Sequence, residues 1–579
     1  MDYPESASPI FTLSQMAKEE LSTELRLLLA FALSFLVIVM SRSLLVKPLP
    51  PAAPKAVAKQ SQPPPLPPAD ATPQAPLETK GESKQGTAEE QITVESDLYQ
   101  VVFSSKGAVV KNWALKGFKD EQNQPLDLVD PVAAHDFGYP FALWVNDPAV
   151  RQEINGALFV PSATGHVHTP VTLTFEYSGP HFAARKEILF PERGYVVEIK
   201  TDLWIDGKPM PHTVGWRGGF GDIHDLGMRG NVVDVFYRDQ QKITRLGPSD
   251  IKGEEATASG TFLYAGIEDR FFSASFMPQQ GALNVFAFRQ DISVAGQTKK
   301  RPSIGMAAGS LDSPQNRLRL FVGPKDTEIL ASVQPQLPDL VDYGWFALVA
   351  KPLFVAMRWI HDHIVANWGW SIILLTLVIN TLMFPLKVKS LRSGMKMQKV
   401  QPQIKAVQEK YKQYKMNDPR KAEMNKELME LYKKHGVNPV GGCLPMLLQM
   451  PFLYGFYKVL VVSIEMRHAP WILWVTDLSA PEHISIRVLP LAMCATQFIL
   501  QRMSPATTPD PAQQKVMMFM PIMFLFLFWN LSSGLVLYWL TGNLVGIVQQ
   551  WYINRTELQH VIADKKTAKS GKKKIEVRK

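Results

Sequence analysis

The sequence predicts a multi-domain membrane protein: an α-helical core of five transmembrane helices, an N-terminal anchor helix, an all-β domain and a helical hairpin. Three observations lead to this fold class. Apolar residues among the 579 cluster into uncharged runs such as 516–529 and 534–548. Short runs of alternating polarity recur through residues 92–340, as in half-buried strands. A basic segment with helical periodicity, 387–436, separates two apolar runs.

The N-terminal region predicts a membrane anchor followed by a tether. Residues 1–26 form a leader, and the apolar run 27–46 is long enough to span, since about 20 helical residues cover the hydrocarbon core. We expect an uncleaved anchor, with a signal peptide as the alternative, because no convincing small-residue cleavage site follows. Residues 47–91 carry eleven prolines between Pro48 and Pro76 and predict an extended spacer.

The β domain, predicted at residues 92–340, shows no sign of enzyme chemistry. Its short strands and turn signals favour a large β-sandwich. His166 and His168 would share one strand face and could begin a metal site, but no third ligand lies near them in the sequence. No GxSxG elbow or P-loop occurs, and Cys443 and Cys494 lack metal-ligand spacing. We therefore expect no metal, no cofactor and no enzymatic activity.

An amphipathic helix is predicted within residues 341–367, beginning near Pro352. Its apolar face and Trp359 favour a position in the membrane interface, and a helix packed on the β domain is the alternative. The residues of that face are Leu353, Met357, Ile360 and Ile364. Five further spans are expected at residues 368–386, 444–462, 488–501, 516–529 and 534–550.

Net charge is uneven along the chain and predicts its orientation. Residues 387–436 hold 14 Lys/Arg against 5 Asp/Glu, and the tail, 554–579, holds 9 against 3. A basic patch can bind nucleic acid, but beside membrane spans the positive-inside rule is the better explanation. We expect both segments in the cytoplasm. The parity of the spans then places the β domain outside and the N-terminus inside.

The basic segment 387–436 predicts an antiparallel helical hairpin. Apolar residues recur at helical spacing on both sides of a turn at Asn417, Asp418 and Pro419, and Gly436 supplies a stop. The two stripes are Val400, Ile404, Val407 and Tyr411, then Met424, Leu428 and Leu431. The hairpin methionines could offer an adaptable client surface, or they could pack between its two helices.

The core spans carry uncharged polar residues and no Asp or Glu. This pattern disfavours a proton-coupled solute transporter, which usually needs an intramembrane carboxylate. A single polar residue usually bonds a neighbouring helix, but together they suggest a wetted interior face. A membrane-tethered carbohydrate-binding protein built on the β domain is a second alternative. The polar residues are Thr376, Asn380, Gln449, Gln497, Thr541, Asn543, Gln549 and Gln550.

A series of motifs between Val341 and Gln550 resembles the YidC/Oxa/Alb family of membrane protein insertases. The motifs occur in the family's order, so the resemblance is specific, whereas the β domain matches mainly in position and size. The motifs include VDYGW at 341–345, NWG at 367–369, FPL at 384–386, VNP at 437–439, GGC at 441–443, QMP at 449–451, DLS at 477–479, MSP at 503–505, QQK at 513–515 and SGLVLY at 533–538.

The resemblance implies a five-helix core enclosing a hydrophilic groove that receives nascent transmembrane segments. It also implies a bacterial inner-membrane location, a periplasmic β-supersandwich and a cytoplasmic hairpin. The expected partners are nascent membrane proteins, the ribosome, the Sec translocon and the lipid bilayer, with no specific nucleic-acid sequence. By matched position, the groove residues would be Thr376, Asn380, Gln449, Tyr538, Trp539 and Gln550.

One position departs from the family pattern. The family usually places an arginine five residues before the Pro-Leu pair of the second span, and that position is Asn380 here. Lys458 would lie roughly 12 Å away in depth and would extend to the outer interface instead. We therefore expect a groove without positive charge, which works by polarity and reduced bilayer thickness and depends little on client acidity.

Overall fold

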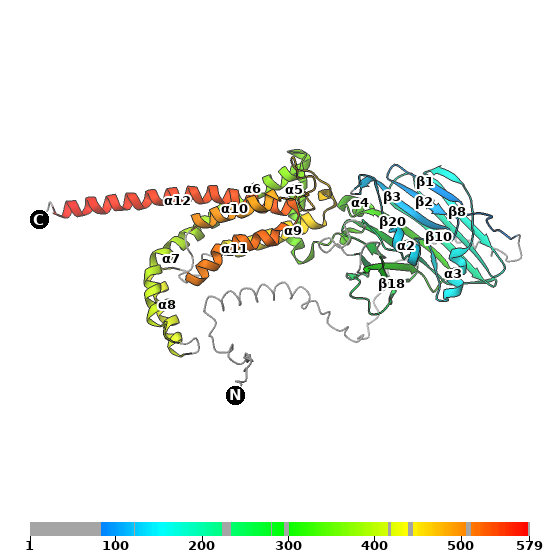
Figure 1. Ribbon diagram of the computed structural model, residues 1–579, viewed down its shortest axis with the longest axis horizontal. Coiled ribbons are helices and arrows are strands. Elements are labelled where there is room, and N and C mark those ends of the chain that lie inside the picture. The colour runs from blue at the N-terminus through cyan, green and yellow to red at the C-terminus, as the bar shows by residue number, and fades with distance from the viewer. Residues whose placement is uncertain are drawn as a thin grey trace, which may run out of the picture. The chain divides into compact units, whose positions relative to one another are not determined.

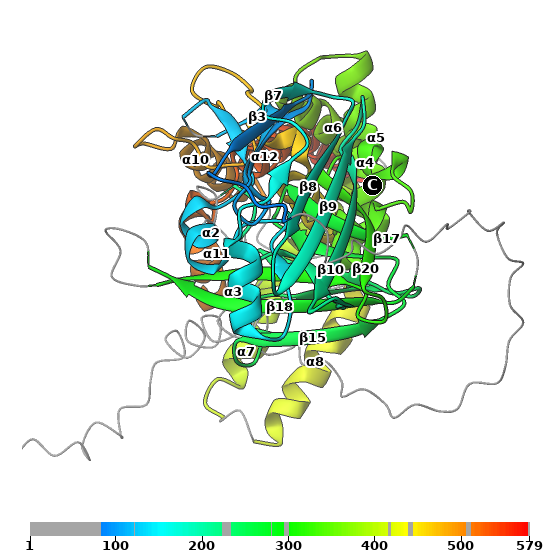
Figure 2. The ribbon, with the colours of Figure 1, turned by 90° about the vertical axis from the view of Figure 1, so that its right-hand side faces the viewer.

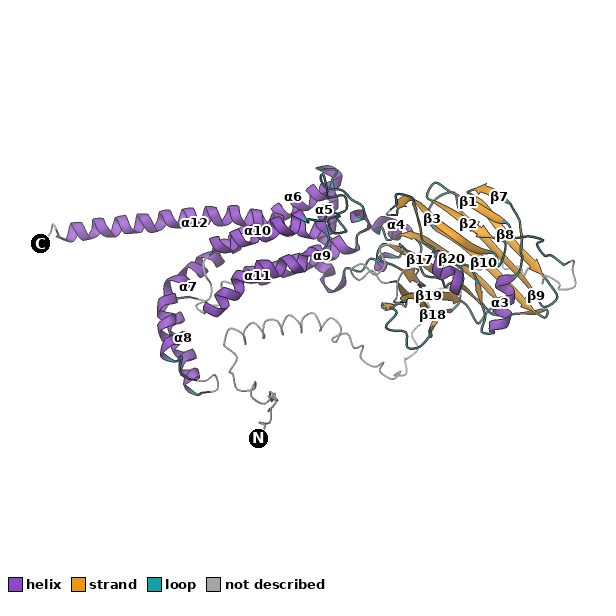
Figure 3. Ribbon diagram, in the orientation of Figure 1, coloured by secondary structure: helices purple, strands orange, loops and turns teal. Residues whose placement is uncertain are grey.

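The computed structural model describes most of the chain as two compact units. Leader and anchor lie outside the described residues, as does most of the predicted tether. The β unit holds the described residues up to Ala347 together with Val461–Glu465, and the helical unit holds the rest. Figure 3 shows the strands and the long helices of these units. The described residues are 83–120, 122–222, 233–279, 281–293, 300–414, 418–437, 444–504 and 511–576.

The β unit contains three sheets. The largest follows the order β14-β13-β16-β17-β20-β10-β9-β8-β6 with β11 paired to β10, and the others are β4-β3-β2-β1-β7 and β15-β18-β19-β12-β5. Figure 2 shows β8, β9, β10 and β20 side by side, as their antiparallel registers require. The strand bounds are β1 Gln91–Glu95, β2 Tyr99–Ser104, β3 Val109–Lys119, β4 Pro125–Asp127, β5 Leu143–Trp144, β6 Val160–Pro161, β7 Gly165–His168, β8 Val171–Ser178, β9 Phe182–Phe190, β10 Val196–Ile205, β11 Lys208–Pro209, β12 Thr213–Trp216, β13 Asp234–Arg238, β14 Ile243–Leu246, β15 Glu255–Gly260, β16 Tyr264–Glu268, β17 Phe272–Pro278, β18 Leu283–Ile292, β19 Arg301–Gly309 and β20 Gln315–Pro324.

Aromatic side chains from all three sheets meet in one core. Trp113 of β3 lies 6.2 Å from Trp216 of β12 and 6.4 Å from Phe190 of β9, measured between ring centroids. All three are fully buried. Three short helices begin at capping aspartates, namely α2 Pro131–Phe137, α3 Pro148–Gly156 and α4 Thr327–Ser332. The predicted β-rich domain is thus confirmed.

A buried lysine ties two of these sheets together. Lys186 of β9 donates to the carbonyl oxygens of Gly107, Ala108 and Phe141 at 2.7, 3.1 and 2.8 Å. Burial lowers the pKa of Lys186 to about 7. An ammonium has three donors, and all three find acceptors here, which is how a polar group is accommodated in a core.

The predicted tether extends too far toward the β domain. Residues 83–91 pack on the strands: Lys84 forms an ion pair with Glu176 at 2.7 Å, and Glu89 accepts a hydrogen bond from Ser104 at 2.6 Å. β1 itself begins at Gln91. Sequence reasoning missed this because the segment is polar and lacks periodicity, and its ordering comes from contacts with residues distant in the chain.

The predicted interfacial helix is α5, Ala347–His363, and it begins earlier than expected. Pro352 lies inside it and not in its first turn. A proline inside a helix leaves the carbonyl four residues earlier, here that of Leu348, without its usual helical donor. The structure buries Leu353, Met357 and Ile360 against other parts of the protein, although this apolar face was expected to lie in the membrane interface, and Ile364 lies beyond the helix and is exposed.

The helical unit contains long helices at the places where spans were predicted. The helix α12 continues through the predicted tail as one element (Figure 1). Two 3₁₀ turns, η1 and η2, precede α5, and η3 follows α9. The helix bounds are α6 Trp368–Leu382, α7 Phe384–Lys410, α8 Arg420–His435, α9 Leu444–Val462, α10 Val488–Met503, α11 Pro511–Trp529 and α12 Ser533–Glu576; the turns are η1 Pro338–Leu340, η2 Gly344–Phe346 and η3 Ile464–Met466.

The second predicted span is broken near its end. It was expected to run through residue 386, but α6 ends at Leu382 and α7 starts at Phe384, with a bend of 57° between them. Pro385 in the first turn of α7 has no N–H to continue the α6 hydrogen-bond ladder. Within the described residues no single helix meets the length and hydropathy of a span, and this bent pair meets them together.

The helices α7 and α8 pack on each other through the predicted apolar stripes. Met397, Val400, Ile404 and Leu428 are buried in one cluster, with Met424 and Leu431 against it. Gly436 ends α8 in the left-handed conformation, at φ 59°, as its stop signal predicted. Asp418 accepts a hydrogen bond from the backbone N–H of Arg420, and Asn417 lies outside the described residues.

Candidate functional site

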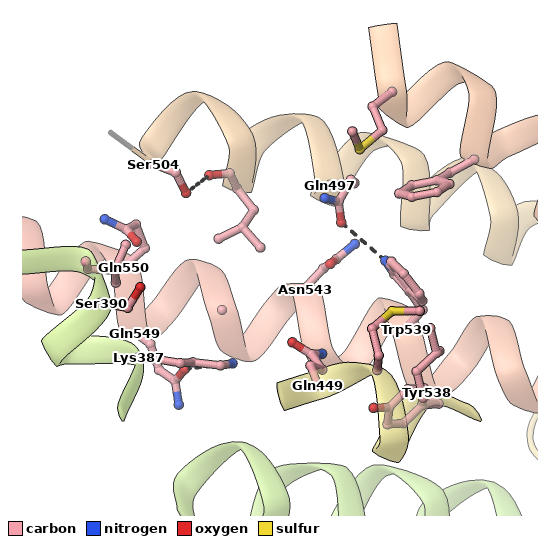
Figure 4. A pocket seen from close by; sticks show the side chains of 18 of the residues that line it. Lys387, Ser390, Gln449, Gln497, Ser504, Tyr538, Trp539, Asn543, Gln549 and Gln550 are labelled. Atoms are coloured by element: carbon pink, nitrogen blue, oxygen red, sulfur yellow. Dashed lines mark hydrogen bonds between the residues drawn. The ribbon is translucent and has the colours of Figure 1, made fainter. Parts of the chain in front are cut away.

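The helical unit contains a half-open cavity of about 360 Å³ between α7, α9, α10, α11 and α12. We call it the polar cavity. Room of this size accommodates on the order of ten waters, at about 30 Å³ each in the liquid. Ten residues with polar side-chain atoms line it (Figure 4): Lys387, Ser390, Gln449, Gln497, Ser504, Tyr538, Trp539, Asn543, Gln549 and Gln550.

One face of α12 forms the longest wall of the polar cavity. Its lining residues recur at intervals of three or four, from Tyr538 through Asn543 to Gln550, which places them on one side of the helix. The twelve helical steps from Tyr538 to Gln550, at 1.5 Å each, give this wall a length of about 18 Å. Gly542 and Gly546 widen the space because they carry no side chain. The polar face therefore extends over more than half of a bilayer's hydrocarbon thickness.

Hydrogen bonds hold several of the polar side chains in place. The indole N–H of Trp539 donates to Oε1 of Gln497 at 3.2 Å (Figure 4). The amide of Asn543 donates to the carbonyl of Met493 at 3.2 Å and to the Thr496 hydroxyl at 3.3 Å. These bonds fix α12 against α10 and leave a polar surface toward the cavity.

A loop covers the N-terminal ends of α6 and α12. The backbone N–H groups of Ser533 and Gly534 donate to the carbonyls of Ala480 and Leu478 at 2.7 and 3.0 Å. At α6, a Cβ added to Gly369 would lie 2.3 Å from the Trp471 ring, so only glycine fits there. The segment 466–487 thus packs on the first residues of these two helices, and the lining residues Gln549 and Gln550 lie further along α12.

The outer surface of the same helices is apolar. On α11, Phe519 and Phe526 are 60% and 76% exposed, and Leu544 and Val548 of α12 are 50% and 65% exposed. Soluble helices place polar residues outside and apolar residues inside. In this unit large apolar side chains are exposed on the outside, while polar and apolar side chains together line the cavity. An apolar exterior is what a lipid environment favours.

Four of the six predicted groove residues line the polar cavity: Gln449, Tyr538, Trp539 and Gln550. The other two lie just behind its wall. Thr376 is buried and its hydroxyl donates to the carbonyl of Ile372 at 2.6 Å, within its own helix. Asn380 is 4% exposed and its amide donates to the carbonyl of Thr376 at 2.8 Å.

The expectation of a groove without positive charge is wrong. Lys387 lines the polar cavity, and its ammonium donates to Oδ1 of Asn380 at 2.7 Å. The same ammonium lies 3.4 Å from Oε1 of Gln549, whose amide donates to the backbone carbonyl of Asn380 at 3.1 Å. Lys458 is not among the lining residues.

Sequence reasoning assigned Lys387 to the hairpin, and Ser390 was missed with it. A signal was present, because Lys387 follows Asn380 by seven residues, a spacing that would place both on one face of a continuous helix. This signal was not used because the boundary between the predicted second span, 368–386, and the predicted hairpin, 387–436, falls directly before Lys387. Gln497, Asn543 and Gln549 were noted as polar but were not assigned to the groove.

Comparisons with known proteins identify the family of both units. A family model described as "60Kd inner membrane protein" matches residues 359–560, and one described as "YidC periplasmic domain" matches residues 91–209 and 225–356. The first falls on the helical unit that holds the polar cavity, and the second on the β unit. The predicted family resemblance is thereby confirmed over most of the chain.

Two relatives and one solved structure show the extent of the similarity. The "Membrane protein insertase YidC" of Syntrophus aciditrophicus is 32% identical over 568 residues, covering 91% of this chain and 99% of the relative. That of Pelobacter propionicus is 36% identical over 488 residues, covering 81% and 88%. An active YidC insertase crystal structure aligns at 18% identity and a TM-score of 0.35, covering 81% of this chain and 94% of that one. The chain belongs to the YidC family of membrane protein insertases.

Proposed function

We propose that the polar cavity receives the hydrophilic parts of nascent transmembrane segments and releases the segments into the bilayer, alone or with the Sec translocon. The observation that carries this proposal is that polar side chains from four helices gather, among apolar ones, at one cavity, while phenylalanine and aliphatic side chains are exposed on the outside of the same helices. No cofactor or covalent step is needed for this activity.

The physical gain is a lower desolvation barrier. A charged residue at the centre of a bilayer costs about 2.5 to 3.5 kcal/mol on insertion scales. Water and amide groups in the polar cavity can hydrogen-bond a hydrophilic segment over about 18 Å of its path, so only the remaining thickness must be crossed without such partners. The apolar exterior then lets the hydrophobic part of the client move directly into lipid.

We infer the orientation from the charge pattern. The hairpin, α7 and α8, and the C-terminal tail would lie in the cytoplasm, and the β unit in the periplasm. The lining residues Gln549 and Gln550 would then lie toward the cytoplasmic side, and the segment 466–487 toward the other. Ribosomes are expected partners for the basic hairpin and tail, because their surfaces are polyanionic.

A proton-coupled transporter is less well supported. Among the described residues that line the polar cavity, none is Asp or Glu. A proton relay through the membrane usually depends on such carboxylates.

The proposal is tested by reconstitution. The full-length chain is placed in liposomes, and a single-span client with a short hydrophilic end is added as a nascent or freshly diluted chain. Insertion is measured as protease protection of the hydrophilic end, with liposomes that lack the chain as control. We expect protection well above the control. Equal protection in both preparations would contradict the proposed function.

A further inference from the structure

The sheet β15-β18-β19-β12-β5 carries a second aromatic cluster, separate from the main core of the β unit. Trp144 of β5, Phe286 and Phe288 of β18, and Ala307 of β19 form this cluster, and all four are buried. The rings of Trp144 and Phe288 lie 4.6 Å apart between centroids. Ala287, between the two phenylalanines, belongs to the main core, and neighbours on a strand point to opposite faces. The cluster therefore occupies the outward face of this sheet.

Two arginines lie over this cluster. The guanidinium carbon of Arg151, on α3, lies 3.6 Å from the centroid of the Trp144 ring. That of Arg217, directly after β12, lies 4.3 Å from the centroids of both the Trp144 and the Phe288 rings. Because both lie over the same indole, the two guanidinium carbons are within about 8 Å of each other. Cation–π attraction holds each charge at a ring face but supplies no hydrogen-bond acceptor for its N–H groups.

Several donors at this place lack acceptors. Across the part of the chain that the structure describes, the side chain of Arg217 forms no ion pair and no hydrogen bond, and its Nε is buried. The buried indole N–H of Trp144 also has no partner there. Arg151 donates to the carbonyl oxygen of Val145 at 3.1 Å. Burial, with the charge of Arg151, lowers the pKa of Arg217 to about 10. Buried donors without acceptors cost free energy, and an oxyanion would supply the acceptors.

The carboxylates closest to acting as counterions are engaged elsewhere. Glu255 belongs to the edge strand β15, which lies beside β18 (Figure 2). Its charge acts on both arginines, but its side chain is exposed and accepts a hydrogen bond from the Thr257 hydroxyl at 3.2 Å. Asp147 acts on Arg151, and its carboxylate caps α3. Within the described residues neither carboxylate forms an ion pair with Arg151 or Arg217, so the donors stay available.

We propose that Arg151, Arg217 and the indole N–H of Trp144 form a binding site for a phosphate group on the β unit. Hydrogen bonds of about 2.9 Å on either side let one oxyanion accept from two guanidinium groups at this separation. A tetrahedral phosphate offers acceptor oxygens in several directions, which suits donors on three side chains better than a flat carboxylate does. The same chemistry occurs in a soluble phosphate ester and in a lipid headgroup. The site needs no part of the polar cavity.

Binding is measured by equilibrium dialysis of radiolabelled inorganic phosphate against the full-length chain in detergent. Salt at about 0.15 M suppresses weak binding to the exposed basic segments. We expect a saturable component that Arg217→Met weakens at least about tenfold, the size of one charge-assisted hydrogen bond. Arg193→Gln removes an exposed arginine elsewhere in the β unit and should leave the affinity unchanged. Glu255→Gln should tighten binding, because it removes a negative charge beside the bound phosphate.

Thermal unfolding separates a binding role from a purely structural one. If Arg217 only stabilises the fold, Arg217→Met should unfold at a lower temperature in phosphate-free buffer. The proposal predicts the same or a higher unfolding temperature, because methionine still packs on the rings and no buried donor is left unpaired. Added phosphate should raise the unfolding temperature of the unmodified chain and of Arg193→Gln, but not that of Arg217→Met.

Competition with labelled phosphate identifies the source of the phosphate group. Tighter competition by a short-chain phosphatidic acid than by glycerol phosphate indicates a lipid headgroup, and equal competition indicates a soluble phosphate ester. Acetate that competes as well as phosphate would overturn the assignment of a phosphate group.

The inference is wrong if the unmodified chain shows no saturable component, or if Arg217→Met and Arg193→Gln bind phosphate alike. It is also wrong if Arg217→Met is less stable than the unmodified chain without phosphate and keeps its affinity. If Arg217→Met does not fold, Arg151→Gln decides the question, and an unchanged phosphate affinity of that variant would contradict the proposal.

Discussion

Filling the polar cavity at Gly542 should block insertion without unfolding the protein. Gly542 lines the cavity, and a Cβ added there would have no atom within 4 Å. A larger side chain can therefore enter the cavity with no clash at its first carbon. Glycine is also a poor helix residue, so Gly542→Ala and Gly542→Leu should each stabilise α12 by up to about 1 kcal/mol. Loss of activity with preserved stability would locate the effect in the cavity.

The magnitude follows from the size of the cavity and the cost of desolvation. The cavity holds about 360 Å³, or on the order of ten waters, and a tryptophan side chain would displace about half of them. Without water in the cavity, the insertion barrier should rise by the full cost of moving a charged residue to the bilayer centre, about 2.5 to 3.5 kcal/mol. The insertion rate would then fall roughly 70-fold to 370-fold, since each 1.36 kcal/mol of barrier changes a rate tenfold. Gly542→Leu should lie between this value and that of Gly542→Ala.

The assay measures initial insertion rates of a client with a charged hydrophilic end, in liposomes, for the series Gly542→Ala, Gly542→Leu and Gly542→Trp. Thermal unfolding of each variant in detergent reports whether it is folded. We expect rates that fall with side-chain size while the melting temperature stays level or rises for alanine and leucine. A folded Gly542→Trp variant that inserts the client at the unmodified rate would refute the assignment of the cavity as the client's path.

Three further predictions concern the tail and the β unit. Removing the residues after Thr556 should weaken cosedimentation with ribosomes at low salt, because it removes most of the tail's positive charge, and unchanged cosedimentation would contradict this role. Lys186→Met should lower the free energy of unfolding of the β unit by roughly 3 kcal/mol in urea titrations of the full chain, because three buried carbonyls lose their donor; Lys200→Met, at a more exposed position, is the control. Burial, with the charge of Glu268, raises the pKa of Asp234 to about 6, so the folded state holds this proton more tightly than the unfolded state does. Stability from this carboxyl should therefore rise by about 1 kcal/mol as the pH falls from 7 to 5, and Asp234→Asn should abolish the rise. The same pH dependence of stability in the unmodified chain and in the Asp234→Asn variant would contradict this prediction.

Local patterns were enough to predict the hairpin. The stripe that includes Ile404 on α7 and the stripe that includes Leu428 on α8 each follow helical periodicity, and such apolar stripes become buried by packing on another helix. Gly436 could be identified as the end of α8 because many helices end in a left-handed residue, and glycine adopts that conformation most easily. The β-rich character of residues 92–340 was predictable for the same reason, since alternation reports half-buried strands.

Features that depend on contacts between distant segments could not be predicted. The ordering of residues 83–91 depends on strands such as β8, and their own polar sequence gives no signal of it. The bend between α6 and α7 is set by packing as well as by Pro385, and it decides where Lys387 lies. Sequence reasoning counted charges by segment and so placed this lysine outside the groove, although its two-turn spacing from Asn380 was visible.

The most direct test of the central claim is to compare the two sides of α12 by photo-crosslinking. A photoreactive residue replaces either Trp539, which lines the polar cavity, or Leu544, which is exposed on the outer surface. The client is a stalled nascent chain with a radiolabelled hydrophilic end and a single apolar span, and the crosslinked part is identified by proteolysis. We predict that position 539 crosslinks to the hydrophilic end at short stall lengths and that position 544 crosslinks only to the apolar span. Equal crosslinking of the hydrophilic end at both positions, or crosslinking of that end at position 544 alone, would contradict the account.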